Sequence, residues 1–140
     1  MPLPALSAVA LYAGLNGLVL FWLTFNVVQV RRGQKIYMGD GGDPLMIRAM
    51  RGQANFVEFV PMTLILIALA ALLGAPALAI HGLGAMLTVG RLLHAWHFTR
   101  ADAPGWQRGA GALLTLLALL LAALGAISHG VMGLGTGLEA

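Results

Sequence analysis

The chain has 140 residues, of which 59% are hydrophobic and only 9% are charged, and its formal net charge is +3. A soluble domain carries about a quarter charged residues, so this composition excludes a water-facing surface and predicts a polytopic membrane protein. The eight basic residues are too few and too scattered for a nucleic-acid surface. Because the sequence has no cysteine, thiol chemistry would require a thiol that a substrate supplies.

Four apolar segments follow one another, and each reaches the roughly 20 residues that cross a bilayer as a helix. Lipid offers backbone amides no other partners short of a closed barrel, and the segments lack the alternation of barrel strands. The sequence therefore predicts an all-α fold, an integral membrane four-helix bundle that forms a single membrane domain over residues 1–140. The expected spans are residues 5–30, 45–73, 77–98 and 106–129.

The connections between these spans predict the orientation. Residues 74–76 (Gly-Ala-Pro) are typical of a tight helical hairpin, whereas residues 31–44 and 99–105 are polar. All eight basic residues lie near the two polar connections, and none lies near the hairpin or either terminus. Because cytoplasmic loops carry an excess of Lys and Arg, we expect both polar connections in the cytoplasm and both termini outside. The glycine-rich tail, residues 130–140, is expected to fray.

An unusual polar stretch, RAMRGQANFVEFVP, opens the second span at residues 48–61. At about 100° per residue, four of its polar side chains fall within roughly an 80° sector of one helix face. Glu58 lies about three turns into the span, where a lone carboxylate is costly and needs a partner. Arg51 can face it directly or across a bound ligand, or the two can form a structural ion pair. The members of this stripe are Arg48, Arg51, Asn55 and Glu58.

These residue types suit a polar ligand that carries charges of both signs. Arginine binds a carboxylate through two parallel hydrogen bonds, glutamate accepts from an ammonium, and asparagine both donates and accepts. Gln53 lies on another face and can serve a neighbouring subunit. Arg91, His94 and Phe98 share a face of the third span, and Arg108 opens the fourth. Such a cluster of cations repels itself unless an anion lies among the arginines.

The sequence also leaves open interpretations without a ligand. Arg48 can snorkel to the membrane interface, and Arg91 and Arg108 can bind lipid phosphate. His94 can be an ordinary hydrogen-bonded helix residue. Three further residues fit the interfacial belt of the membrane: Trp96, His97 and Trp106.

The second span contains the arrangement R-x-x-x-N-x-x-E-x-x-P, which resembles the signature of the MAPEG family, the membrane-associated proteins in eicosanoid and glutathione metabolism. The family includes microsomal glutathione transferases, leukotriene C4 synthase and microsomal prostaglandin E synthase. The similarity extends over nearly the whole chain, through its length, its four spans, the basic loop after the first span and R-x-x-[HY] in the third. In this chain the arrangement is made by Arg51, Asn55, Glu58 and Pro61.

The resemblance implies a homotrimer with three sites between neighbouring subunits near the cytoplasmic face, and glutathione as co-substrate. It implies a glutathione S-transferase whose bound thiolate attacks lipophilic electrophiles. Glutathione peroxidase activity toward lipid hydroperoxides would be a second activity. His94 and Phe98 stand where eicosanoid enzymes carry tyrosine, which fits a bacterial branch in the inner membrane. Arg108 aligns with the arginine thought to stabilise the thiolate, and no metal is expected. The residues expected to bind glutathione are Arg31, Arg32, Arg48, Arg51, Gln53, Asn55, Glu58, Arg91 and His94.

Other classes of protein stay open at this point. A small proton-coupled multidrug exporter would use Glu58, although the arginines would repel its cationic substrates. A haem-binding electron carrier would need two axial histidines, yet His94 and His97 lie at the opposite ends of the spans from His81 and His129. A non-catalytic MAPEG homologue that binds lipid or a partner protein is the last alternative. The sequence does not identify the electrophile.

Overall fold

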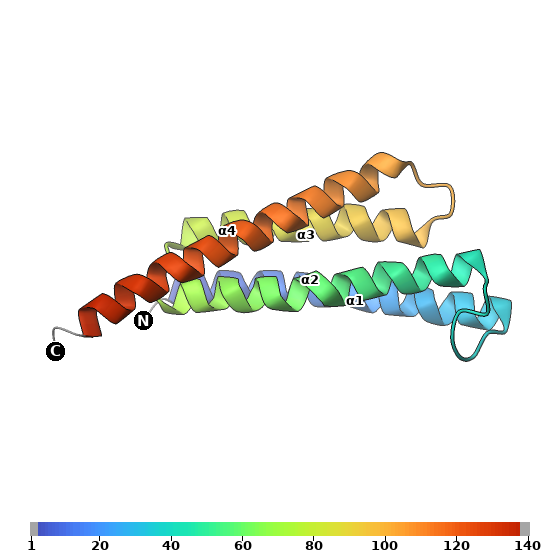
Figure 1. Ribbon diagram of the computed structural model, residues 1–140, viewed down its shortest axis with the longest axis horizontal. Helices are drawn as coiled ribbons and strands as arrows, with labels where there is room; N and C mark the ends of the chain where they lie inside the picture. Colours follow the sequence, from blue (N-terminus) through green and yellow to red (C-terminus); the bar gives the residue numbers. More distant parts are fainter. Residues whose placement is uncertain (1–2, 138–140) are drawn as a thin grey trace.

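The computed structural model describes residues 3–137, which form four α-helices and their connections (Figure 1). All four helices are long and apolar enough to cross a membrane. The prediction of an all-helical integral membrane protein with four spanning helices is therefore confirmed. The helices are α1 (Leu3–Gln34), α2 (Pro44–Leu72), α3 (Ala77–Thr99) and α4 (Gly105–Gly137).

The helices pack so that α2 and α3 form the middle of the bundle. Within the described chain, α1 packs against α2 and α3, α4 packs against the same two helices, and α1 does not contact α4. Figure 1 shows α4 crossing the bundle obliquely, so that the α3–α4 hairpin diverges from α2 toward the end that carries residues 35–43 and 100–104. We call this the basic end, because these connections and the adjoining helix turns carry all eight Lys and Arg residues.

The local sequence explains where α2 begins and ends. The Asp43 side chain accepts a hydrogen bond of 2.9 Å from the backbone N–H three residues later, and Pro44 occupies the first helical position, where no N–H is needed. At the other end, Gly74 adopts a φ of 96°, and the N–H of Ala75 donates to the carbonyl of Ala70 at 2.9 Å. This Schellman motif stops the helix and lets α3 return antiparallel to α2.

Two helices run further than the expected spans. α1 continues past the arginine pair to Gln34, so the first connection begins at Lys35. α4 continues to Gly137, so the expectation of a frayed tail is wrong for residues 130–137, while residues 138–140 lie outside the described part. Each glycine in this segment weakens the helix by about 1 kcal/mol relative to alanine. Glycine still has a backbone N–H, unlike proline, so the helical hydrogen bonds can continue through the segment.

The close approach of α3 and α4 depends on two facing glycines. A Cβ atom added at Gly111 would lie 2.6 Å from the carbonyl oxygen of Gly90 and 2.8 Å from the backbone nitrogen of His94. Small residues allow such backbone contact between helices in lipid, where packing replaces the hydrophobic driving force. The contact fixes the position of His94 relative to α4.

We expect Gly111→Ala to destabilise the bundle by about 1–3 kcal/mol, the usual cost of adding atoms to a packed interface. Thermal unfolding in detergent, followed by circular dichroism, would show a lower midpoint. Gly109→Ala is the matched control on the same helix, because no atom lies within 4 Å of its added Cβ. Equal midpoints for the two variants would contradict the close approach.

Candidate functional site

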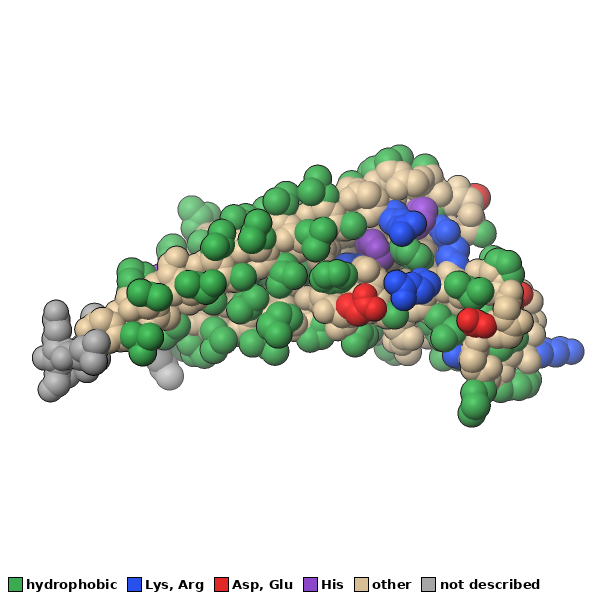
Figure 2. Space-filling model, viewed as in Figure 1, with side chains coloured by type: hydrophobic (Ala, Val, Ile, Leu, Met, Phe, Trp, Pro, Cys, Tyr) green, Lys and Arg blue, Asp and Glu red, His purple; other side chains and the backbone are tan. Residues whose placement is uncertain are grey.

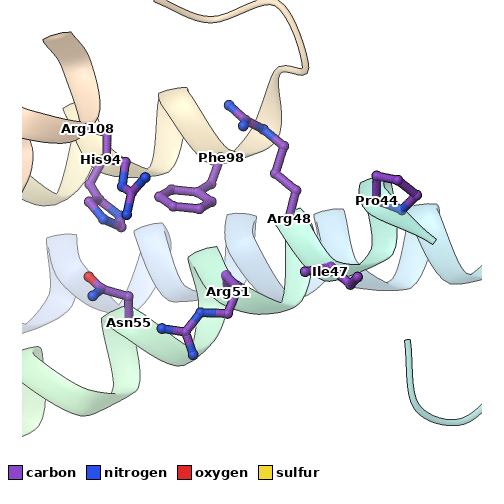
Figure 3. Close-up of a pocket in the computed structure, with 8 residues that line it drawn as sticks. All are labelled: Pro44, Ile47, Arg48, Arg51, Asn55, His94, Phe98 and Arg108. Atoms are coloured by element: carbon purple, nitrogen blue, oxygen red, sulfur yellow. The ribbon is translucent and has the colours of Figure 1, made fainter. Parts of the chain in front are cut away.

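A groove of about 400 Å³ lies between α2 and the α3–α4 hairpin at the basic end (Figure 3). Arg48 and Arg51 of α2 line it together with Arg108 of α4, and His94 and Phe98 form the wall from α3. Figure 2 shows basic and histidine side chains gathered at this end, while hydrophobic side chains dominate the rest of the same face. None of the lining residues is acidic, so the groove favours anions. The remaining lining residues are Pro44, Ile47 and Asn55.

Arg91 lies fully buried beside the groove, where α2, α3 and α4 meet. Both terminal nitrogens of its guanidinium donate to Asn55 Oδ1 at 3.1 Å, and Nη1 also donates to Thr115 Oγ1 at 3.4 Å. The Phe56 ring centroid lies 5.7 Å from the guanidinium carbon. These partners are all neutral, and Nε has no hydrogen-bond partner. The burial rules out the alternative that Arg91 faces lipid phosphate, and its positive charge adds to that of the groove.

His94 presents an unused nitrogen at the groove wall. Its side chain is buried, its ring stacks on Phe98 with 4.7 Å between centroids, and Nδ1 has no hydrogen-bond partner. The alternative of an ordinary hydrogen-bonded histidine therefore does not hold for this nitrogen. Within residues 3–137, no three His, Asp or Glu side chains are grouped so that they could hold a metal ion.

Phe98 separates two of the groove arginines. Its ring centroid lies 5.5 Å from the guanidinium carbon of Arg48 and 5.9 Å from that of Arg108 (Figure 3). Phe98 can approach α2 because position 52 is glycine, where an added Cβ would lie 2.6 Å from the Phe98 Cβ. Contacts between a cation and an aromatic ring are attractive, so Phe98 helps to hold both arginines apart. The sequence analysis did not identify Gly52 as a residue that shapes the site. The only sign of its role in the sequence is that a glycine interrupts the polar stretch.

Arg48 joins α2 to the end of α3. Its Nη2 donates to the backbone carbonyls of His97 and Arg100, the latter at 2.9 Å. Carbonyls at a helix C-terminus lack helical partners and attract cations, so Arg48 acts as a cap from another helix rather than as a snorkelling side chain. His97, for which the sequence predicts a place in the interfacial belt, is instead buried, and its Nδ1 lies 3.1 Å from the Pro104 carbonyl oxygen.

Apart from the buried Arg91 and from Glu58, three more predicted site residues do not line the groove. Arg31 donates to the carbonyl of Gly39 at 2.8 Å and thereby organises the connection after α1. Arg32 is exposed on the last turn of α1. Gln53 donates to Thr24 Oγ1 at 2.9 Å and links α2 to α1 within the same chain. Of these three residues, Arg32 is the one whose side chain is exposed and available to bind a ligand or another subunit.

Arg51 and Glu58 lie on the surface of α2, and the structure forms no ion pair between them. Figure 3 shows the Arg51 side chain running away from Phe98, whereas Asn55 points toward His94. Within residues 3–137 the ion pair between Arg100 and Asp102 is the only one. Glu58 thus keeps an unpaired carboxylate on a spanning helix, a position at which charges are costly without a protein neighbour.

The fold and the site define a four-helix integral membrane protein with an arginine-lined groove at one end. A profile of the MAPEG family matches residues 9–128, which include every residue of the groove. The chain therefore belongs to the MAPEG family, as the arrangement from Arg51 to Pro61 indicated. It is 36% identical over 115 residues to inner membrane protein YecN of Escherichia coli K12, across 82% of this chain and 86% of that protein. YecN of E. coli O6:H1 strain CFT073 matches with the same values.

We expect Asn55→Leu to lower the unfolding midpoint, because it removes the acceptor that both terminal nitrogens of the buried Arg91 share. Hydrogen bonds to charged groups are worth about 1.5–3 kcal/mol. Asn55→Asp keeps the shape, restores the acceptor and adds a compensating charge, so its midpoint should equal or exceed that of the natural protein. Thermal unfolding in detergent measures both, and a fully stable Asn55→Leu variant would contradict the importance of this contact.

Proposed function

We propose that this protein is a membrane-bound glutathione transferase, which activates glutathione as a thiolate for attack on lipophilic electrophiles. The observation that carries the proposal is a groove lined by three guanidinium groups and no carboxylate, beside a fourth, buried guanidinium. Such a group of cations is stabilised by an anionic ligand. The volume of about 400 Å³ lies within the roughly 300–1,000 Å³ of small-molecule pockets.

Glutathione offers two carboxylates, one ammonium and a thiol, and the groove has partners for the carboxylates and the thiol. Arg48 and Arg51 suit the carboxylates, since a guanidinium can donate two parallel hydrogen bonds to each. Arg91 holds Oδ1 of Asn55, which leaves the Asn55 amide N–H groups as donors to the ligand. The MAPEG membership supports the choice of glutathione among small anions.

The thiolate is the nucleophile in this proposal, and Arg108 stabilises it. A free cysteine thiol has a pKa near ~8.5, and an adjacent guanidinium in a poorly solvated site favours the charged form. Each unit by which the pKa falls corresponds to about 1.4 kcal/mol. The lipophilic electrophile reaches the groove through the bilayer, and the same thiolate would attack the peroxide bond of a lipid hydroperoxide.

A homotrimer would complete the site. In the single chain the side chains of Arg51 and Glu58 are exposed on a spanning helix, and polar groups at such positions need protein neighbours. In the proposed assembly a second subunit covers this face of α2, and Glu58 meets the ammonium of glutathione. Arg32, which is exposed on α1, would reach the ligand from the adjacent subunit.

The proposed location is a bacterial inner membrane, with the active site near its cytoplasmic face. Similarity to an inner membrane protein of Escherichia coli supports the membrane. The confinement of all eight Lys and Arg residues to one end of the bundle supports a cytoplasmic basic end. Both termini, at the other end, would then lie outside the cytoplasm.

Two other functions are less well supported. A proton-coupled exporter of cationic drugs would need Glu58 inside a cavity, but Glu58 does not line the groove and the arginines that do would repel a cation. A non-catalytic homologue that binds lipid or a partner protein would retain the groove without binding glutathione. Measurement of glutathione binding separates this last alternative from the enzyme.

We expect Arg51→Ala to weaken glutathione binding at least about tenfold, since loss of one charge-assisted hydrogen bond is worth roughly that factor. Equilibrium dialysis with the detergent-purified oligomer measures the affinity. Lys35→Ala is the control, because it removes a basic group at the same end that does not line the groove. Natural affinity in Arg51→Ala would refute the role of this residue, and no binding by the folded natural protein would refute the proposed function.

We expect Arg108→Ala to reduce thiolate formation more than it reduces binding, because the lost guanidinium stabilises only the charged form of the thiol. The ultraviolet absorbance of the thiolate, recorded as glutathione is titrated at several pH values, separates the two effects. The apparent pKa of the bound thiol should rise toward ~8.5. An unchanged thiolate absorbance at saturation would transfer the role to another arginine of the site.

A further inference from the structure

A second hollow, of about 370 Å³, lies at the connection between α3 and α4 and shares no lining residue with the groove. Trp96 of α3 lines it together with Trp106 and Gln107 of α4, and Arg100 and Asp102 line it from the connection between these helices. The hollow thus belongs to the basic end but not to the proposed glutathione site. Its remaining lining residues are Ala103 and Pro104.

The polar residues that line this hollow are a cation, an anion and a buried glutamine. Arg100 Nε and Asp102 Oδ1 lie 3.7 Å apart, and the two side chains are 58% and 82% exposed. Such an exposed ion pair contributes little to stability. Arg100 and Asp102 can therefore give up their mutual contact and bind a ligand instead. Gln107 is only 2% exposed, and its Oε1 has no hydrogen-bond partner. A buried carbonyl oxygen without a donor is costly, so an N–H group from a ligand would be stabilising here.

The apolar part of the hollow places it at the membrane surface. Trp96 and Trp106 are 42% and 60% exposed, and they lie near the end of one spanning helix and at the start of the next. Tryptophan at such positions lies at the level of lipid headgroups, where one side of the ring is apolar and the other is wet. An occupant with a charged head and an apolar body fits this environment.

We propose that this hollow binds a phospholipid whose headgroup carries a primary ammonium beside its phosphate, as in an ethanolamine phospholipid. The Arg100 guanidinium donates to the phosphate. The ammonium has three N–H donors, which the Asp102 carboxylate and Gln107 Oε1 accept. A choline headgroup has no N–H to donate, and a glycerol headgroup has no positive charge to place beside Asp102. This site does not depend on the proposed transferase activity.

The test is quenching of tryptophan fluorescence by phospholipids with brominated acyl chains in mixed micelles. The chain has three tryptophans, so a Trp22→Phe background leaves Trp96 and Trp106 as reporters. Ethanolamine, choline and glycerol phospholipids with identical brominated chains are the probes. The ethanolamine lipid should reach half-maximal quenching at a mole fraction about tenfold lower than the other two, the factor expected for one charge-assisted hydrogen bond.

Variants assign this preference to the hollow. Asp102→Ala and Gln107→Leu should each reduce the preference for ethanolamine over choline, and Arg100→Gln should weaken binding of all three lipids. Lys35→Gln, an exposed basic residue at the same end outside the hollow, should leave the preference unchanged. Asp102 and Arg100 lie on an exposed connection, so these variants keep the test valid even if Gln107→Leu does not fold.

Three results would overturn the proposal. Equal quenching by the three headgroups would mean that the tryptophans report only the surrounding lipid. A preference that survives in Asp102→Ala, or natural binding of all three lipids by Arg100→Gln, would place the lipid site elsewhere. Loss of the preference on addition of water-soluble phosphoethanolamine, at concentrations equal to those of the lipid, would assign the hollow to a free phosphate ester rather than to a membrane lipid.

Discussion

The guanidinium of Arg91, buried without a carboxylate, is the constraint on which the basic end depends. Arginine does not give up its proton in proteins, so this charge has to be stabilised where it lies. Two neutral oxygens, Asn55 Oδ1 and Thr115 Oγ1, accept its hydrogen bonds, and the Phe56 ring lies beside it. These contacts join α3 to α2 and α4 at one level of the bundle. They also fix the amide of Asn55 at the lining of the groove.

The groove beside Arg91 is shaped by contacts that keep two of its three arginines in place before any ligand binds. Arg48 is bound to the terminal carbonyls of α3, and the Phe98 ring lies between Arg48 and Arg108. The close contact of Phe98 with Gly52 sets the distance between α2 and α3 here. Preorganised cations of this kind stabilise developing negative charge without reorganisation. The physical argument for an anionic co-substrate therefore depends on packing as much as on charge.

The sequence was sufficient for the helical membrane fold, because four long apolar runs and one family signature carry that information directly. It was not sufficient for the direction of individual side chains. A helical wheel places Arg48 and Glu58 in one sector, yet Arg48 caps α3 while Glu58 lies exposed on α2. The deciding factor is where the diverging α3–α4 hairpin meets α2. Arg31 shows the same limit, since its bond to Gly39 depends on the fold of the connection.

The groove and the second hollow lie against the same turn of the chain, and Arg48 connects them. Arg48 lines the groove and donates to the carbonyl of Arg100, while the side chain of Arg100 lines the hollow. A phospholipid bound at Arg100 would therefore rest on the segment whose carbonyls hold a groove arginine in position. With the proposed phospholipid in the hollow, the geometry of the groove would depend on the position of the hairpin relative to the headgroups. This dependence follows from Arg48, because its one side chain both lines the groove and donates hydrogen bonds to the carbonyls at the end of α3.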